Sequence, residues 1–179
     1  MKILVVCGTN RDGALTRLLA KQVARIHEEL GGNVDFLDMD ELPADALLPT
    51  AYKEKTTAVQ TLVDRFLASD GVVFVVPEYN GSFPGILKLF VDMLPFPEGL
   101  DGRPCAFIGL AAGRFRSLRA VEHFQQVTGY RNAFNFPRRV FIGDSFSQFD
   151  DGKLKDEELV QRLQDQAKGF VDFVQRIKA

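Results

Sequence analysis

The stretch Pro77-Glu78-Tyr79-Asn80-Gly81-Ser82-Phe83-Pro84-Gly85 is the most informative part of this sequence for the fold. It follows an apolar, β-branched run at residues 72–76, which is typical of a strand buried on both faces. A second apolar run, residues 86–94, has helical length and stops before Pro95. The stretch therefore connects the carboxyl end of a parallel strand to a helix, and ligands bind at such turns in open α/β sheets.

The side chains of this turn suit a planar, polar ligand. Tyr79 can offer a flat face to a ring, while Asn80, Gly81 and Ser82 offer donors, acceptors and an approachable backbone. Proline, asparagine, glycine and serine are also ordinary turn residues, so a plain turn is the alternative.

The composition is that of a globular domain. The chain has 179 residues, of which 46% are hydrophobic and 26% charged, and we expect one domain over residues 1–179. The net charge of −2 gives no basic footprint for nucleic acid. No apolar segment approaches the roughly 20 residues that span a bilayer, so membrane insertion is not expected. Cys7 and Cys105 both adjoin apolar runs, which favours buried thiols in a reducing, cytoplasmic compartment.

A second polar loop, residues 8–14, separates a strand at 2–7 from a helix that ends before Gly31. Free backbone N–H groups and the helix dipole make such a helix start a ready anion site. Thr9 and Thr16 can donate hydroxyl hydrogen bonds, and Arg11 brings a guanidinium suited to phosphate. The alternative is that the loop side chains only cap the helix.

The loop does not carry the motif of a P-loop NTPase, because Gly13 is followed by Ala14 rather than by lysine. It also lacks the Gly-x-Gly-x-x-Gly pattern, because position 10 is Asn. A small tyrosine phosphatase would use Cys7 as its nucleophile, but that chemistry needs an arginine where Gly13 stands. A buried structural thiol is the simpler interpretation of this cysteine.

Periodicity along the chain predicts five strands alternating with five helices. The predicted strands lie at residues 2–7, 34–39, 72–76, 105–110 and 134–142. The helices include segments 53–69 and 84–94, with a long loop through Tyr52 that we expect to form a lid or rim. We expect Asp156 to cap the last helix after a turn at 149–153. His27 and His123 are isolated, which gives no metal-site spacing, and both are expected at the surface.

This alternation predicts a doubly wound, parallel α/β sheet with helices on both faces. In the order 2-1-3-4-5, strands one and three are neighbours at the point where the strand order reverses. The polar loops after strands one, three and four then converge at one edge. A mononucleotide such as FMN belongs between strands one and three. The loop after strand four contains Ala112 and Gly113, followed by Arg114, Phe115 and Arg116. These last three are candidates for binding the nicotinamide phosphate or an anionic acceptor, with plain surface charges as the alternative.

The central stretch resembles the Pro-Glu-Tyr-Asn-x-Ser-x-Pro-Gly-x-Leu-Lys signature of the NADPH-dependent FMN reductase family. Gly8-Thr9-Asn10-Arg11 is similar to the family's phosphate loop. By that resemblance, side chains and backbone N–H groups of the first loop would hold the FMN phosphate, and the central turn would run along the isoalloxazine ring. The loop after strand four would complete the cofactor site. The predicted cofactor-binding residues are Gly8, Thr9, Arg11, Ala14, Leu15, Thr16, Pro77, Glu78, Tyr79, Asn80, Ser82, Ala112 and Gly113.

The resemblance implies an FMN-dependent oxidoreductase that takes electrons from NADPH or NADH. The acceptor would be a quinone, a flavin, an azo compound or a metal oxyanion such as chromate. The flavin carries the chemistry in such enzymes, so no catalytic side chain is expected. The family fold is flavodoxin-like, with a five-stranded parallel sheet, and family members are usually homodimers or homotetramers. Ala14 and Thr16 depart from the family's usual serine and asparagine. A binding module without FMN therefore stays open as an alternative. A flavodoxin-type electron carrier is a second alternative, although such carriers are typically strongly acidic and the net charge of −2 argues against it.

Overall fold

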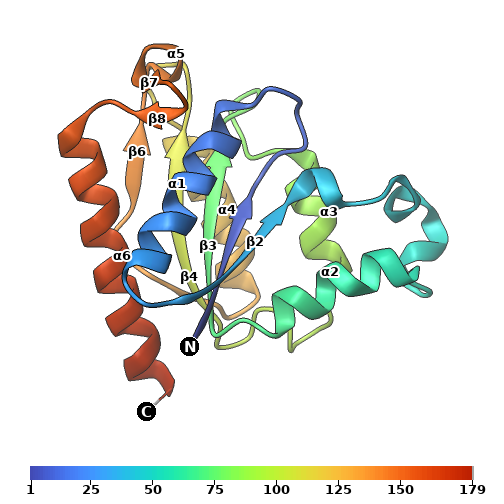
Figure 1. Ribbon diagram of the computed structural model, residues 1–179. Coiled ribbons are helices and arrows are strands. Elements are labelled where there is room, and N and C mark those ends of the chain that lie inside the picture. The colour runs from blue at the N-terminus through green and yellow to red at the C-terminus, as the bar shows by residue number, and fades with distance from the viewer. Residues whose placement is uncertain (179) are drawn as a thin grey trace.

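The computed structural model describes residues 1–178 as a parallel sheet between two layers of helices (Figure 1). The strands are β1 (Lys2–Cys7), β2 (Asn33–Asp38), β3 (Gly71–Pro77), β4 (Pro104–Leu110), β5 (Phe134–Asn135) and β6 (Val140–Ile142). The main helices are α1 (Leu15–Glu29), α2 (Thr57–Leu67), α3 (Gly85–Met93), α4 (Leu118–Tyr130) and α6 (Glu157–Lys178). The order is β2-β1-β3-β4-β5, with β6 also paired to β4. The predicted flavodoxin-like α/β fold is confirmed.

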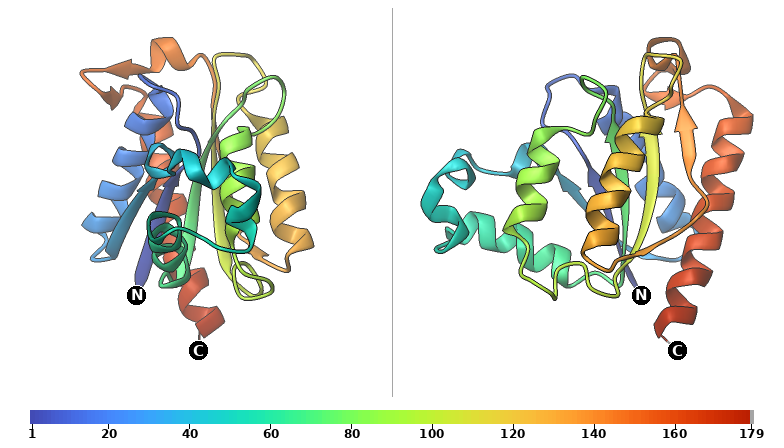
Figure 2. Two further views of the ribbon diagram at one scale, coloured as in Figure 1. Left: turned by 90° about the vertical axis from the view of Figure 1, so that its right-hand side faces the viewer. Right: turned by 180° about the vertical axis from the view of Figure 1, so that it is seen from behind.

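Alternate residues of the central strands supply two separate cores. In β1, Leu4 and Val6 pack beneath α2, α3 and α4, whereas Ile3 and Val5 pack beneath α1 and α6. The views from the front and from behind show these two helical layers (Figures 1 and 2). Strands covered on both faces must be apolar at every position, which explains the unbroken valine-rich runs in the sequence.

The fifth strand is not continuous, contrary to the prediction of one strand over residues 134–142. It is divided into β5 and β6, which pair with the two ends of β4. Pro137 lies in the gap and has no N–H to donate to a neighbouring strand. The amide of Gln166, from α6, donates instead to the carbonyl oxygens of Phe107 (3.0 Å) and Arg138 (2.8 Å). The Gln166 side chain therefore supplies hydrogen bonds at the point where β5 and β6 leave a gap in the strand pairing.

His27 is also placed differently from the prediction. Its side chain is 2% exposed at the end of α1, and its ring meets Phe170 of α6 edge-on, with centroids 6.4 Å apart. Its Nδ1 atom is buried without a hydrogen-bond partner among the described residues. The expectation of a surface histidine was wrong here because the covering helix α6 lies more than a hundred positions away in the sequence.

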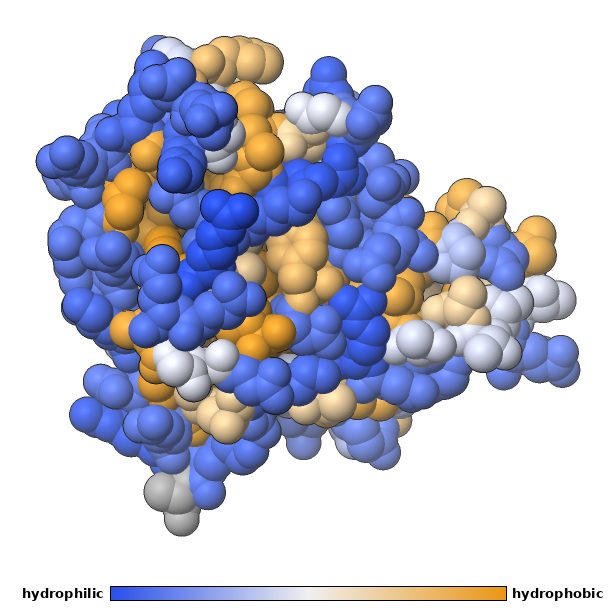
Figure 3. Space-filling view, in the orientation of Figure 1, coloured by the Kyte–Doolittle hydropathy of each residue, from blue (hydrophilic) through white to orange (hydrophobic). Residues whose placement is uncertain are grey.

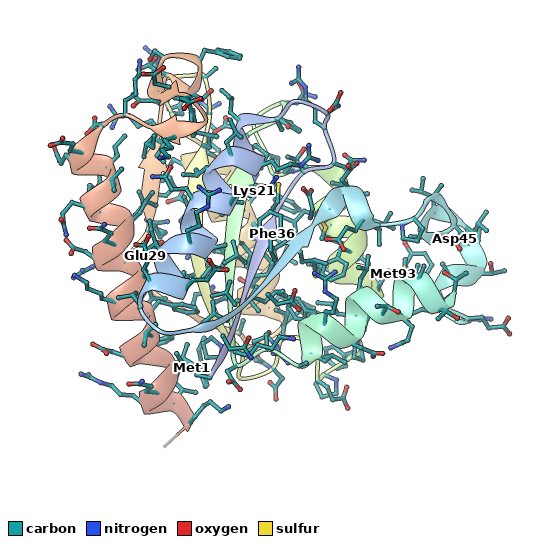
Figure 4. The ribbon with its side chains drawn as sticks, in the orientation of Figure 1. Met1, Lys21, Glu29, Phe36, Asp45 and Met93 are labelled. Atoms are coloured by element: carbon teal, nitrogen blue, oxygen red, sulfur yellow. The ribbon has the colours of Figure 1, made fainter. Side chains whose placement is uncertain are left out.

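The segment before α2 for which we expected a lid or rim, residues 42–52, forms a projecting arm that contains short helical turns. Three short 3-10 helices, η1 (Met39–Glu41), η2 (Ala44–Leu47) and η3 (Pro49–Tyr52), follow β2. The predicted helix over 53–69 begins later, at Thr57. Figure 4 shows Asp45 on this arm, far from the sheet.

The arm carries apolar side chains at its surface. Leu47 is 71% exposed and Tyr52 is 54% exposed. The space-filling view shows apolar surface at this end of the molecule (Figure 3). Within residues 1–178, none of the helices combines the length and apolar character that a membrane span requires.

All parallel strands present their carboxyl ends at one edge of the sheet, the upper edge in Figure 1. The short helix α5 (Ser145–Gln148) and a hairpin of β7 (Phe149–Asp150) and β8 (Lys153–Leu154) lie at the same edge. The predicted turn at 149–153 is this hairpin. Asp156 caps α6, as predicted, because its carboxylate accepts the N–H of Leu159 at 3.1 Å.

Candidate functional site

A cavity of about 240 Å³ opens at this carboxyl edge. The loops after β1, β3 and β4 all contribute to it, which confirms that they converge. Its lining residues are Arg11, Asp12, Gly13, Ala14, Leu15, Thr16, Pro77, Glu78, Tyr79, Leu110, Ala111, Ala112, Ser145 and Phe146.

The first turn of α1 faces this cavity without a cap. The residue before the helix, Ala14, offers no side-chain hydrogen bond. Within the described residues, the N–H groups of Leu15 and Thr16 have no acceptor, whereas the N–H of Ala14 donates to the carbonyl of Arg11 (3.3 Å). Capping of α1 by loop side chains is therefore excluded. The uncapped donors and the positive end of the helix dipole form an anion site.

Arg11 and Tyr79 form one wall of the cavity. The guanidinium carbon of Arg11 lies 5.9 Å from the centre of the Tyr79 ring, in a cation–π arrangement. Below them, Thr9 is fully buried, and its hydroxyl lies 3.0 Å from the phenolic oxygen of Tyr79. That hydroxyl also accepts the N–H of Arg11 at 3.2 Å. Thr9 thus supports the wall from behind instead of lining the cavity.

The turn after β3 is closed by two reciprocal hydrogen bonds. The N–H of Tyr79 donates to the carbonyl of Ser82 (2.8 Å), and the N–H of Ser82 donates to the carbonyl of Tyr79 (3.1 Å). Asn80 and Gly81 both have left-handed backbones, with φ of 51° and 79°. This is the geometry for which an Asn-Gly pair is preferred.

Glu78 carries an unpaired acceptor into the site. Its Oε2 atom is buried without a hydrogen-bond partner among the described residues, and the residue lines the cavity. An unsatisfied buried polar atom costs about 1–3 kcal/mol, so a ligand that brings a donor is favoured here. The isoalloxazine of a flavin carries one ring N–H among its acceptors. Together with the anion site on α1, this donor requirement fits FMN.

Cys7 does not provide a nucleophile. It is fully buried in β1, and its Sγ atom lies 3.7 Å from the carbonyl oxygen of Thr9. Burial, and next the nearby Asp38 carboxylate, raise the pKa of the thiol to about 12. A thiol in this state is not ionised near neutral pH, so the phosphatase alternative has no support.

The loop after β4 borders a second cavity of about 220 Å³, which shares Glu78, Ala111 and Ala112 with the first. Phe115 and Arg116 line this second cavity; Arg114 lines neither.

Cation–π contacts and close packing order this loop. Two guanidinium groups contact the Phe115 ring, with the carbon of Arg114 at 5.0 Å and that of Arg119 at 4.0 Å from its centre. The side chain of Arg116 passes so close over Gly143 that an added Cβ there would lie 2.7 Å from its Cγ. Gly143 therefore leaves room for Arg116.

Most of the residues predicted for the site line one of the two cavities, with four exceptions, of which Arg114 is one. Gly8 and Thr9 lie behind the cavity wall; at Gly8 an added Cβ would lie 2.8 Å from the carbonyl oxygen of Val75. The Ser82 side chain turns away toward α4. Sequence reasoning missed Ser145 and Phe146, which follow β6. The sequence signal that could have identified them is the Gly-Asp-Ser turn at residues 143–145, which follows an apolar run and lies at the same edge of the sheet as the other loops.

Comparisons with known proteins agree with this geometry. A family model described as NADPH-dependent FMN reductase matches residues 1–148. The NADPH-dependent FMN reductase ArsH of Rhizobium meliloti is 28% identical over 177 residues, covering 96% of this chain and 71% of that protein. A quinone reductase of Escherichia coli is 26% identical over 186 residues, covering 99% of this chain and 97% of that protein. In fold, the chain resembles FerB, a flavoenzyme NAD(P)H:(acceptor) oxidoreductase from Paracoccus denitrificans. The TM-score is 0.81 at 24% identity, covering 98% and 97% of the two chains.

Proposed function

Because this chain belongs to the NADPH-dependent FMN reductase family, we propose that residues 1–179 act as one FMN-binding domain with NAD(P)H oxidoreductase activity. Membership confirms the resemblance read from the Pro-Glu-Tyr-Asn motif and the expectation of an oxidoreductase. The proposal adds that NADPH or NADH reduces bound FMN and that a small-molecule acceptor then takes the electrons. We propose a quinone, a flavin, an azo compound or a metal oxyanion such as chromate as that acceptor.

The observation that carries the proposal is that one cavity contains both an uncapped helix start and a buried, unpaired carboxylate oxygen, Oε2 of Glu78. Leu15 and Thr16 offer free N–H groups, and Arg11 offers a guanidinium, for the phosphate of FMN. Glu78 offers its unpaired oxygen, and Tyr79 its ring, for the isoalloxazine. Bound FMN supplies hydride acceptance and electron transfer. The tasks of the chain are to bind the ring, orient it and leave one face accessible.

We assign the second cavity to the nicotinamide or the electron acceptor. It adjoins the first, and Phe115 and Arg116 contribute an aromatic ring and a cation to it. Arg114, exposed on the same loop, is available for the additional phosphate of NADPH.

Binding of FMN and of riboflavin tests the flavin assignment. These two ligands differ by the phosphate, so their affinity ratio isolates the anion site. We expect saturable one-to-one FMN binding, with riboflavin at least tenfold weaker. Replacing Arg11 by glutamine is expected to reduce that ratio, whereas the matched replacement of Arg114 by glutamine leaves it unchanged. If the wild-type chain binds neither flavin, the proposed function is wrong.

Turnover tests the redox assignment. The FMN-loaded chain should oxidise NADPH or NADH when benzoquinone is supplied as acceptor. A chain that binds FMN but transfers no electrons from either nucleotide would instead support the electron-carrier alternative.

We also propose a cytoplasmic homodimer or homotetramer. Cys7 and Cys105 are both free and buried, which suits a reducing compartment. Phe96 and Tyr130 are 71% and 83% exposed, more than a lone domain needs at its surface. Light scattering on the purified chain would give its mass, and a mass of about 20 kDa, that of one chain, would contradict the oligomer.

A further inference from the structure

The side chain of Ser82 contacts α4 instead of the cavity. Its Oγ atom lies 3.1 Å from Nδ1 of His123, a residue in the middle of α4. Ser82 lines neither of the two cavities, although it belongs to the turn that borders both. The side chain of this residue of the signature motif therefore contacts a residue outside the motif.

The turn transmits this contact to the cavity wall. Ser82 and Tyr79 exchange two backbone hydrogen bonds of 2.8 and 3.1 Å, and the two residues between them are left-handed. A turn closed in this way has little freedom, so a displacement of Ser82 displaces Tyr79 as well.

The opposite side of the turn has its own anchor. The phenolic oxygen of Tyr79 lies 3.0 Å from the hydroxyl of Thr9, in the loop after β1. Two hydrogen bonds from different layers thus hold the turn: one from the β1 loop and one from α4. The first comes from a buried side chain, and the second comes from an exposed one.

We propose that His123 is a positioning residue that sets the turn at Tyr79–Ser82 against the flavin through Ser82. This inference rests on the proposed function. His123 also lines a groove of about 510 Å³ between α3 and α4, with Phe96 and Tyr130. It therefore stands between that groove and the flavin cavity, and the orientation of the ring-binding turn depends on a side chain outside the cavity.

A double-mutant cycle on flavin affinity tests the inference. His123→Ala and Ser82→Ala are each expected to weaken FMN binding about fivefold, and the double variant should be no weaker than either single one. His123→Asn should restore binding to within about twofold, because its amide can replace Nδ1 as a hydrogen-bonding atom. Gln126→Ala, on the same helix and groove, is the matched control and should bind as the wild type does.

Riboflavin and the visible spectrum give readouts that a general loss of structure would not reproduce. Because His123 acts on the ring-binding turn, its loss should weaken FMN and riboflavin equally, leaving their ratio unchanged. The bound-flavin absorption band should shift toward that of free flavin in His123→Ala and return in His123→Asn.

Two results would overturn the inference but not the proposed function. One is wild-type affinity in His123→Ala. The other is a His123→Ala effect that persists unchanged in the Ser82→Ala background. A wild-type chain that binds no flavin would overturn both the inference and the proposed function.

Discussion

The hydroxyl of Thr9 lies 3.0 Å from the phenolic oxygen of Tyr79, joining the loop after β1 to the loop after β3. These strands are neighbours in the sheet, and the sheet order reverses between them. The contact thus fixes the distance between the proposed phosphate site on α1 and the proposed ring site on the β3 turn.

Replacing Tyr79 by phenylalanine removes this hydrogen bond and keeps the ring beneath Arg11. We expect FMN to bind about three- to tenfold more weakly, because a hydrogen bond of this kind contributes roughly 0.5–1.5 kcal/mol. Fluorescence titration measures the change. Tyr52→Phe, on the arm outside the cavity, is the control and should have no effect. Equal affinities for Tyr79→Phe and the wild type would show that the contact does not matter for binding.

Phe146 is 85% exposed at the rim of the cavity and should contact the bound flavin. The chain contains no tryptophan, so Phe146→Trp introduces a single reporter. We expect strong quenching of its emission when FMN binds. Phe134 lies in β5, which pairs with the first residues of β4 at the edge of the sheet opposite the cavity. The emission of Phe134→Trp should therefore be quenched far less. Similar quenching in the two variants would place the flavin elsewhere.

His27 should make stability depend on pH in mildly acidic solution. Burial lowers the pKa of His27 to about 4, from an ordinary value of 6.5. Between these values the unfolded chain binds a proton that the folded chain does not, so stability falls as the pH drops from about 6.5 to 4. The total effect is roughly 3 kcal/mol, at about 1.4 kcal/mol per pKa unit.

Urea unfolding between pH 4.5 and 7.5 measures this effect. His27→Leu should flatten the slope, whereas His123→Asn, at the exposed histidine, should retain it. Arg65 lowers the pKa of the Asp35 carboxyl below its ordinary value of 3.8, so that ion pair is lost only at more acidic pH. If the free energy of unfolding of His27→Leu depends on pH as that of the wild type does, other groups cause the acid sensitivity.

Arg103 should be a major contributor to stability. Its guanidinium donates to the carbonyl of Ser69 (2.6 Å) after α2 and to that of Gly99 (2.7 Å), and it lies 5.1 Å from the centre of the Phe66 ring. We expect Arg103→Ala to lower the free energy of unfolding by about 2–3 kcal/mol, since buried carbonyls lose a charged donor. Arg25→Ala, at an exposed position of α1, is the comparison and should cost less than about 0.5 kcal/mol.

Local patterns in the sequence predict the fold and most of the candidate site. Continuous apolar runs specify strands covered on both faces, and their alternation with helical periods places the loops after the strands at one edge of a parallel sheet. The Asn80-Gly81 pair encoded a left-handed turn, because few other residue pairs adopt that backbone at low cost. These signals are local, so they can be read along the chain.

Packing between distant elements sets which side chains line the cavities and which lie behind the cavity wall. Ser82 turned to His123, Thr9 became a support for Tyr79, and Phe146 joined the cavity rim. Gln166 likewise completed the sheet across the broken fifth strand, and α6 buried His27. Each outcome depends on a partner distant in sequence, and residue spacing carries no information about hydrogen bonds between elements that meet only after the layers have packed.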